Sequence, residues 1–311
     1  MKTDWINLLC DPMDGTKLKL VNPVIKKGHI VSGKLIGRSG NIYHIKMGIP
    51  ILLPHGSQSL NSVESFAFEW NEWGYLFAKK NWLKNNIRPL LGKESELKGK
   101  IIVDAGAGSG AQSRWMAEAG AKLVISLELS NTIFNRHKKT IKGFEDVIFP
   151  IQCDISCLPV IVKPDILYCI NVLQHTKDPK KTFEKLSLLL NKKSIFLFNV
   201  YNQEGFLGSK TVKTLRQITK RLPYRIWKWL SFFIASGIFT LDKIAPWVIK
   251  SKYNNNHFSK DFKELWLQIY DAFGAHYYQF PLTQKEQLNL FKKAGLRVEA
   301  KSDFGYLLVK K

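Results

Sequence analysis

The chain has 311 residues, 45% of them hydrophobic, which is enough for one large domain or for a domain with appendages. Its 47 Lys and Arg residues against 25 Asp and Glu residues give a formal charge of +22, spread along the chain. This charge leaves open a partner such as RNA or an anionic membrane, or a compositional bias without function. The sequence contains neither a disulfide framework, nor an apolar signal region, nor a transmembrane segment, so we expect a cytoplasmic protein.

Residues 1–56 are predicted to form a small β module, because short strand-like runs alternate with turns. The closing run GNIYHIKMGIPILL resembles the final hairpin of a zinc-ribbon domain. Cys10 is kept at one ligand position, but Met13, Ile36 and Ser39 occupy the others. One thiol cannot build a tetrahedral zinc site, so we expect a degenerate module that binds no metal.

Residues 57–98 are predicted to be a helical lead-in to the next domain. Trp70, Trp73, Phe77 and Trp82 fall near helical spacing, which favours an aromatic stripe packed on the sheet that follows. Tyr75 lies within this stripe and is a candidate for a substrate contact.

The run IIVDAGAGSG, residues 101–110, predicts a buried strand followed by a glycine turn and a helix. Such a unit opens nucleotide-binding α/β folds. Asp104 precedes the first glycine, where it would repel a dinucleotide pyrophosphate but meet a cationic ligand group. Glu128 ends the next strand, about 20 positions after the loop, where an acidic residue can accept hydrogen bonds from ribose hydroxyls.

Strands and helices alternate from residue 99 to 201, and a terminal hairpin is expected within 281–311. This order predicts an α/β fold, with a Rossmann-like, seven-stranded, mostly parallel sheet that carries a terminal antiparallel strand. Asp104, Glu128, Asp154 and Asn171 follow or end its strands. They should therefore meet at the carboxyl edge of the sheet, where ligands bind in such folds.

Four segments in this order, VDAGAGSG, SLELS, QCDISCLP and DILYCINVLQHTKDP, resemble the motifs of class I S-adenosylmethionine-dependent methyltransferases. The resemblance implies S-adenosylmethionine as the cofactor and suggests a role for each matching position. The methionine part would be held by Asp104, Ala105, Gly106, Ala107, Gly108 and Gly110; the ribose by Glu128 with Leu129; the adenine by Asp154 with Ile155; and the transfer site would be bordered by Asn171 and Leu173.

Residues 202–280 interrupt the fold and are predicted to be a helical cap insertion. The uncharged run from Trp229 to Leu241 is too short for a bilayer, which needs about 20 apolar residues. Two interpretations remain: a cap that closes a substrate pocket, or an interfacial membrane helix within 226–249. Asp271 and Tyr277 are candidate substrate contacts. Thr283 and Glu286 predict a capping box for the last helix.

The leading functional hypothesis is methyl transfer to a small molecule, a lipid or a glycan precursor beneath the cap. His175 is the candidate catalytic base, because an imidazole exchanges protons near neutral pH. An RNA or tRNA acceptor is the alternative, supported by the charge, by the basic segment from Lys210 to Arg225 and by the zinc-ribbon resemblance. A protein that binds S-adenosylmethionine without turnover is a third hypothesis. Asp104 disfavours a nicotinamide oxidoreductase.

Overall fold

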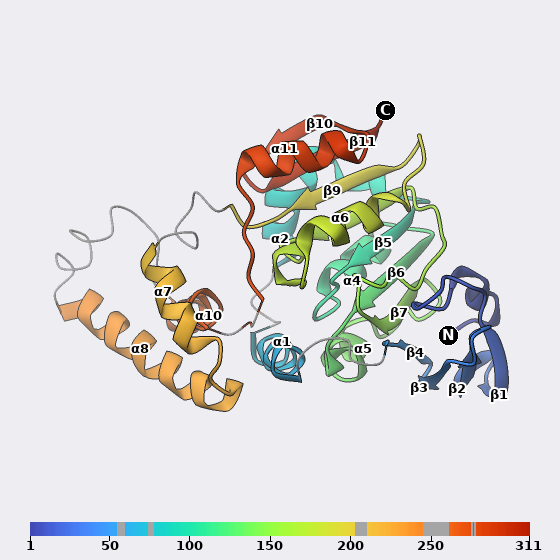
Figure 1. The fold of residues 1–311 in the computed structure, drawn as a ribbon, viewed down its shortest axis with the longest axis horizontal. Helices are drawn as coiled ribbons and strands as arrows, with labels where there is room; N and C mark the ends of the chain where they lie inside the picture. The colour runs from blue at the N-terminus through green and yellow to red at the C-terminus, as the bar shows by residue number, and fades with distance from the viewer. Residues whose placement is uncertain (55–59, 74–77, 203–209, 245–260, 275, 277) are drawn as a thin grey trace.

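The computed structural model describes residues 1–54, 60–73, 78–202, 210–244, 261–274, 276 and 278–311 (Figure 1). One twisted sheet runs through the molecule in the order β1-β2-β3-β4-β7-β6-β5-β8-β9-β11-β10. The strands are β1 (Lys19–Lys26), β2 (His29–Ile36), β3 (Ile42–Lys46), β4 (Ile49–Leu52), β5 (Ile101–Ala105), β6 (Leu123–Glu128), β7 (Ile148–Cys153), β8 (Ile166–Ile170), β9 (Ile195–Asn199), β10 (Leu296–Ser302) and β11 (Gly305–Lys310).

The centre of the sheet is parallel and buried on both faces, as the apolar runs in the sequence predict. β5 pairs in parallel with β6 on one side and with β8 on the other, and β7 and β9 extend the parallel set. Ile102, Val103 and Leu127 are fully buried, because helices cover both faces of a parallel sheet. The carboxyl ends of these strands therefore form one edge, where the ligand-binding loops lie.

The chain ends in the predicted antiparallel hairpin. β11 pairs antiparallel with both β9 and β10. The helix before it, α11 (Gln284–Lys293), begins with the predicted capping box, in which Thr283 Oγ1 accepts from the Glu286 backbone and the Glu286 carboxylate accepts from the Thr283 N–H.

The strands of the predicted small N-terminal β module join the sheet that the seven strands β5–β11 form. β4 pairs in parallel with β7 through Ile51 and Leu52, so β1–β4 extend the same sheet to eleven strands. The Trp5 ring packs on Phe149 of β7, with ring centroids 4.7 Å apart. β7 can accept these strands because, without them, its open edge would leave backbone N–H and C=O groups unpaired.

The lead-in helices divide their aromatic residues between two cores. Trp82 packs at the sheet and donates from Nε1 to the Tyr168 hydroxyl at 3.2 Å. Trp73 instead packs with Trp227 and Tyr270 of the helical insertion, so the stripe expected on the sheet is split. The lead-in comprises α1 (Leu60–Trp73), α2 (Lys79–Trp82), the short π-helix η2 (Leu83–Ile87), α3 (Arg88–Leu91) and η3 (Glu94–Leu97).

The helical insertion stands at one end of the molecule, opposite the N-terminal strands (Figure 1). Its helices are α7 (Lys210–Thr219), α8 (Tyr224–Ile244) and α10 (Phe262–Phe273). No helix among the described residues is both long enough and apolar enough to cross a bilayer. The remaining helices are η1 (Thr3–Leu8), α4 (Ala111–Glu118), η4 (Asn131–Phe134), α5 (Arg136–Thr140), η5 (Leu173–His175) and α6 (Pro179–Ser187).

Candidate active site

The glycine loop after β5 is covered by side chains from two other elements. Gly106, Gly108 and Gly110 have positive φ angles of 90°, 52° and 77°. A Cβ at Gly108 would lie 2.7 Å from Cε2 of Trp70 on α1, and a Cβ at Gly106 would overlap the Val172 side chain. Only glycine leaves room for these side chains, so the loop packs closely against α1 and against the segment after β8.

Two buried carboxyl groups lie behind this loop. Glu128 accepts from the Gly108 N–H and from the Ser130 N–H, both at 2.8 Å, so it ties the loop to the end of β6. Asp104 accepts from the Ser113 hydroxyl. Burial raises the pKa of Glu128, and burial, together with the charge of Glu128, raises the pKa of Asp104 to about 7. Each carboxyl group keeps lone pairs that can accept from a cationic or hydroxyl-bearing ligand.

A pocket opens at the carboxyl edge of the sheet, beside the loop. It is lined by Phe66, Trp70, Gly106, Leu127, Glu128, Leu129, Cys153, Asp154, Ile155, Asn171, Val172, His175 and Thr176. Apolar walls next to the Glu128 and Asp154 carboxylates suit an adenosine, with its flat base and its ribose hydroxyls. The lining residues therefore fit S-adenosylmethionine, which would supply a sulfonium methyl group.

Several predicted cofactor residues lie behind this lining. Asp104, Ala105 and Leu173 are buried beneath the pocket, and Leu173 belongs to the core between the sheet and its helices. Ala107 lines a neighbouring cleft. Val172 lines the pocket where Leu173 was expected, since Asn171 adopts a left-handed φ of 58° that redirects the chain.

Sequence reasoning also missed Phe66 and Trp70 as pocket residues. Both stand on α1, one helical turn apart, and line the pocket. Their i, i+4 spacing was a visible signal for one shared helix face, but the identity of the surface under that face depends on tertiary packing. Tyr75 and Tyr277, the two predicted substrate tyrosines, lie outside the described residues.

A buried polar cluster adjoins the pocket. His276 Nε2 lies 3.0 Å from Glu69 Oε2 of α1 and 3.2 Å from Asp271 Oδ1 of α10. The Tyr201 hydroxyl donates to Asp271 Oδ2 at 3.0 Å. The Arg216 guanidinium donates to three carbonyl oxygens at the end of α10 and beyond, including that of His276 at 2.7 Å. The cluster thus joins the insertion to α1 and to the end of β9.

Charges in this cluster balance when His276 is protonated. Burial alone would lower the pKa of His276, but Asp271 and Glu69 hold it above the ordinary value. Burial would raise the pKa of Asp271, but hydrogen bonding and charge from His276 hold it below the ordinary value. Glu69 has a raised pKa, mainly through burial. A protonated His276 therefore stands between the two carboxyl groups.

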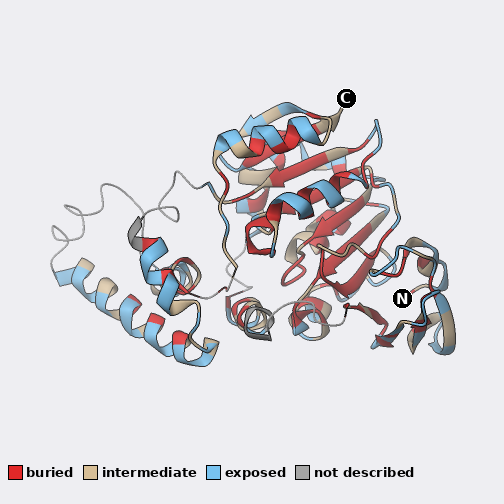
Figure 2. Cartoon of the chain, in the orientation of Figure 1, coloured by how far each residue is buried: buried red, intermediate tan, exposed pale blue. Residues whose placement is uncertain are grey.

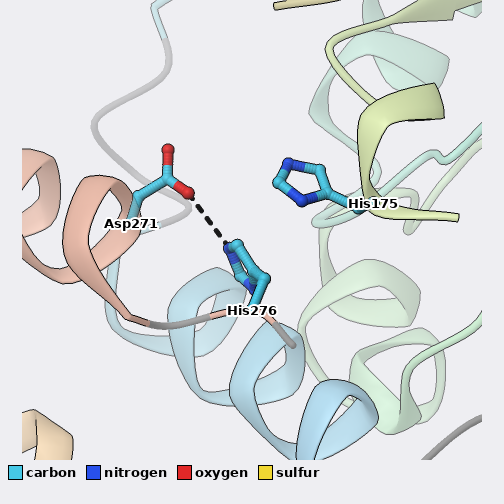
Figure 3. A group of neighbouring side chains, drawn as sticks. All are labelled: His175, Asp271 and His276. Atoms are coloured by element: carbon cyan, nitrogen blue, oxygen red, sulfur yellow. Dashed lines mark ion pairs between the residues drawn. The ribbon is translucent and has the colours of Figure 1, made fainter. Parts of the chain in front are cut away.

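His175 faces Asp271 and His276, as Figure 3 shows. Its Nδ1 lies 3.1 Å from the Tyr278 carbonyl oxygen, which fixes Nδ1 as the protonated nitrogen of the neutral ring and leaves Nε2 as an acceptor. Burial and the nearby His276 lower the pKa of His175 to about 3. The sequence prediction relied on a pKa near neutrality; burial removes that basis, because it disfavours the charged ring.

The donor atoms of His175, Asp271 and His276 lie within 4.8 Å of one another, a spacing at which side chains could share a cation. The sequence predicted no metal ligands. His276 Nε2 lies within 3.2 Å of an oxygen of both Glu69 and Asp271, and these carboxyl groups favour a proton on that nitrogen. This proton would have to leave before the same nitrogen could bind a metal.

A wider cleft of about 500 Å³ begins at Gly106 and Val172 and extends past the polar cluster to α2 and α10. Glu69, His175, Tyr201, Asp271 and His276 line its side toward the insertion. A second ligand in this cleft would therefore meet the pocket at Asn171 and Val172, which line both spaces. Two adjoining spaces that share a wall are what a group transfer between two bound molecules requires.

A model of a protein family described as a methyltransferase domain matches residues 78–301. Among curated proteins, Probable histone-arginine methyltransferase 1.3 of Arabidopsis thaliana is 32% identical over 102 residues, covering 27% of this chain and 19% of that protein. Histone-arginine methyltransferase CARMER of Drosophila ananassae is 33% identical over 87 residues, covering 26% and 16%. The chain thus spans less than a fifth of the length of these relatives.

Among solved structures, the S-adenosylmethionine-dependent methyltransferase from Mesorhizobium loti is similar at 17% identity and a TM-score of 0.42, over 69% of this chain and 91% of that one. The family model covers more than half of the chain, including the glycine loop, Glu128, Asp154 and Asn171. The protein therefore belongs to the methyltransferase domain family.

Proposed function

We propose that the protein transfers the methyl group of S-adenosylmethionine to a hydroxyl-bearing acceptor of low charge, such as a glycan precursor, a lipid headgroup or another small molecule. One observation carries this proposal. The described lining of the cleft contains no lysine or arginine, although the chain has 47 of them. A polyanionic acceptor would need cations along its path, whereas this cleft offers amides, carboxyl groups and aromatic rings.

The polar lining suits hydroxyl groups. Amide and carboxyl oxygens accept from hydroxyls, amide N–H groups donate to them, and aromatic faces pack on sugar rings or apolar chains. The side chains that support this specificity are Asn81, Asn85, Asn86, Gln112, Asn171, Asn199 and Gln268, with Glu69, Glu264 and Asp271, and with the rings of Phe66, Trp70, Trp82 and Tyr201.

For the cofactor, we retain the roles that the family resemblance suggests. The backbone from Gly106 to Gly110, with Asp104 behind it, would hold the methionine part. Glu128 and Leu129 would bind the ribose, and Asp154 and Ile155 the adenine. The sulfonium supplies its own leaving group, so these residues act by orienting the two reactants and excluding water.

His175 is proposed to orient the acceptor hydroxyl. Its Nε2 can accept a hydrogen bond from that hydroxyl. Its low pKa makes it a weak base, but the proton becomes strongly acidic as the methyl group passes from sulfur to oxygen, so Nε2 can take it and release it to solvent. Asp271, between His276 and the Tyr201 hydroxyl, is proposed to contact the same acceptor from the insertion side. The protonated His276 would then keep Asp271 ionised and correctly placed.

The RNA alternative is supported by the net charge and by the basic segment from Lys210 to Arg225. Such a segment could hold a phosphate backbone, but an RNA base would still have to enter a cleft whose described lining has no lysine or arginine. Binding of S-adenosylmethionine without turnover is the other alternative.

Calorimetric titration with S-adenosylhomocysteine tests cofactor binding first. Glu128→Ala should weaken binding at least about tenfold, because the carboxylate is proposed to bind ribose and also ties down the Gly108 loop. The exposed Glu96→Ala is the matched control and should bind like wild type. Tighter binding of NADH than of the thioether would contradict the proposal.

Methyl transfer is then followed with radiolabelled S-adenosylmethionine. Glycan-precursor, lipid and total-RNA fractions of a cell extract serve as acceptors in parallel reactions. Label in the first or second fraction, lost in Asp271→Asn but not in Glu96→Ala, would support the proposal. Label confined to RNA would support the alternative, and binding without transfer to any fraction would indicate a non-catalytic protein.

Two further expectations remain proposals. We propose that the N-terminal module is a degenerate zinc ribbon: Cys10 remains, and hydrogen bonds from Tyr43 and Asn41 to the buried Asp11 tie its segments together. A cytoplasmic location is supported by four cysteines that are all free thiols.

A further inference from the structure

α8 has two contrasting faces. On one face, Trp227 Nε1 donates to the Tyr270 carbonyl at 2.9 Å, Ser231 accepts from Trp266 at 3.1 Å, and Ala235 is fully buried against α10. The opposite face carries large apolar side chains in solvent, and Figure 2 shows α8 largely in the colour of exposed residues. These side chains, called here the α8 stripe, are Ile226, Trp229, Leu230, Phe233, Ile234, Leu241 and Ile244, with exposed fractions of 39% to 71%.

The α8 stripe follows helical geometry. Ile226, Trp229, Leu230, Phe233 and Ile234 are spaced i, i+3, i+4, i+7 and i+8, which places them on one side of the helix. If α8 served only to close a cleft, it would need a single apolar face, and its buried face already packs on α10. Contiguous exposed apolar surface of this kind marks an interaction site.

Basic side chains border the α8 stripe. Arg221 and Arg225 stand at the start of α8 and are exposed, and Lys243 stands at its end. Lys228 Nζ lies 4.7 Å from the centroid of the Phe68 ring and 5.7 Å from that of Trp229. Cations beside an apolar stripe with Trp and Phe are the pattern of a helix that lies in the plane of an anionic membrane surface.

We propose that the α8 stripe docks on an anionic lipid surface, with Trp229 and Phe233 in the acyl boundary and the flanking Arg and Lys residues at the headgroups. A second copy of the chain is the competing occupant. It would bring two basic borders together in a protein of charge +22, whereas anionic lipid neutralises them. α7, just before α8 in the chain, carries two further exposed apolar side chains, Leu215 and Ile218.

Vesicle flotation tests the docking surface, using the full chain. Wild type should float with vesicles of phosphatidylcholine and phosphatidylglycerol, and much less with phosphatidylcholine alone or at high salt. The double variant Trp229→Gln, Phe233→Gln should lose at least about tenfold in vesicle partitioning, because two large apolar side chains no longer leave water. The matched control Leu188→Gln, Ile161→Gln changes two exposed apolar residues outside the insertion and should float like wild type.

Light scattering after gel filtration and calorimetry with S-adenosylhomocysteine accompany each variant. The proposal is overturned if wild type fails to float with anionic vesicles, or if both double variants lose the same amount. It is also overturned if the α8 variant converts a dimer to a monomer without changing flotation, since the occupant is then a second copy. Unchanged binding of S-adenosylhomocysteine by the α8 variant shows that its fold is intact. The flotation result therefore does not depend on whether the proposed acceptor is correct.

Discussion

Gly108 and Trp70 depend on each other at the residue scale. A Cβ at Gly108 would lie 2.7 Å from the indole, and the backbone there has a left-handed φ of 52°. Gly108→Ala should therefore cost about 1–3 kcal/mol in the free energy of unfolding, through overpacking. Urea unfolding measures this cost. The exposed Gly143→Ala is the control, because its φ is 89° but nothing lies within 4 Å, so it adds strain without a clash.

A double variant separates the packing clash at Gly108 from the backbone strain. Gly108→Ala combined with Trp70→Leu removes the indole that meets the new methyl group, and should recover part of the lost stability. If the stability losses of the two single variants simply add in the double variant, the Trp70 indole does not clash with the new methyl group at position 108.

The ion pairs of His276 make a pH-dependent prediction. Because the folded state raises the pKa of His276, the stabilisation is complete below its ordinary pKa of about 6.5 and is lost as the pH rises through the raised value. His276→Asn should lower the free energy of unfolding by ~3 kcal/mol near pH 6, since it removes the imidazolium that lies between the buried Glu69 and Asp271 carboxyl groups. The difference from wild type should shrink at alkaline pH.

Urea unfolding from pH 6 to pH 9 provides the measurement. His29→Asn, which removes an exposed contact with Asp146, is the control and should change stability by less than about 1 kcal/mol. A gap between wild type and His276→Asn that widens with pH would show that His276 is not held as a cation.

At the scale of elements, the last helix illustrates what local sequence specifies. The residues Thr283 and Glu286 predicted a capping box, and the structure confirms both of its hydrogen bonds. Thr283→Ala should cost about 1 kcal/mol in unfolding free energy, because it leaves an N–H at the start of α11 without its acceptor. Thermal unfolding of Thr283→Ala beside Thr283→Ser measures it, and equal losses in the two variants would contradict a capping role.

α8 shows the limit of the same local reasoning. Its apolar run was recognised in the sequence, but the run alone could not say which residues pack on α10 and which face solvent. Both faces of α8 contain large apolar residues, so periodicity favours neither side. The contacts of Trp227 and Ser231 with α10 assign the buried face, and the α8 stripe is what remains.

At the scale of the whole molecule, the N-terminal strands belong to one folding unit with the sheet. Deleting residues 1–54 would expose the edge of β7, where β4 now pairs, and would uncover Phe149 beneath Trp5. The truncated chain should therefore aggregate, because an open, apolar edge strand pairs with other chains. Gel filtration and thermal unfolding of residues 55–311 check this. A monodisperse fragment with the wild-type melting temperature would instead show that the sheet folds without residues 1–54.

The sequence by itself determined the features that depend on neighbours along the chain. The glycine loop after β5, the acidic ends of the strands and the capping box of α11 are each specified within a few residues. The alternation of strands and helices then implies a parallel sheet, whose carboxyl edge gathers Glu128, Asp154 and Asn171. This is why the fold class, and the meeting of these three residues at one pocket, could be predicted.

Only the tertiary structure decided what depends on contacts between distant segments. Hydrogen bonding at the edge of β7 joins the N-terminal strands to the sheet, and packing places Phe66 and Trp70 over the glycine loop. Burial and the nearby His276 lower the pKa of His175, an effect that no local pattern encodes. Solvation and charge act through space, so residues far apart in the chain determine the character of the acceptor cleft.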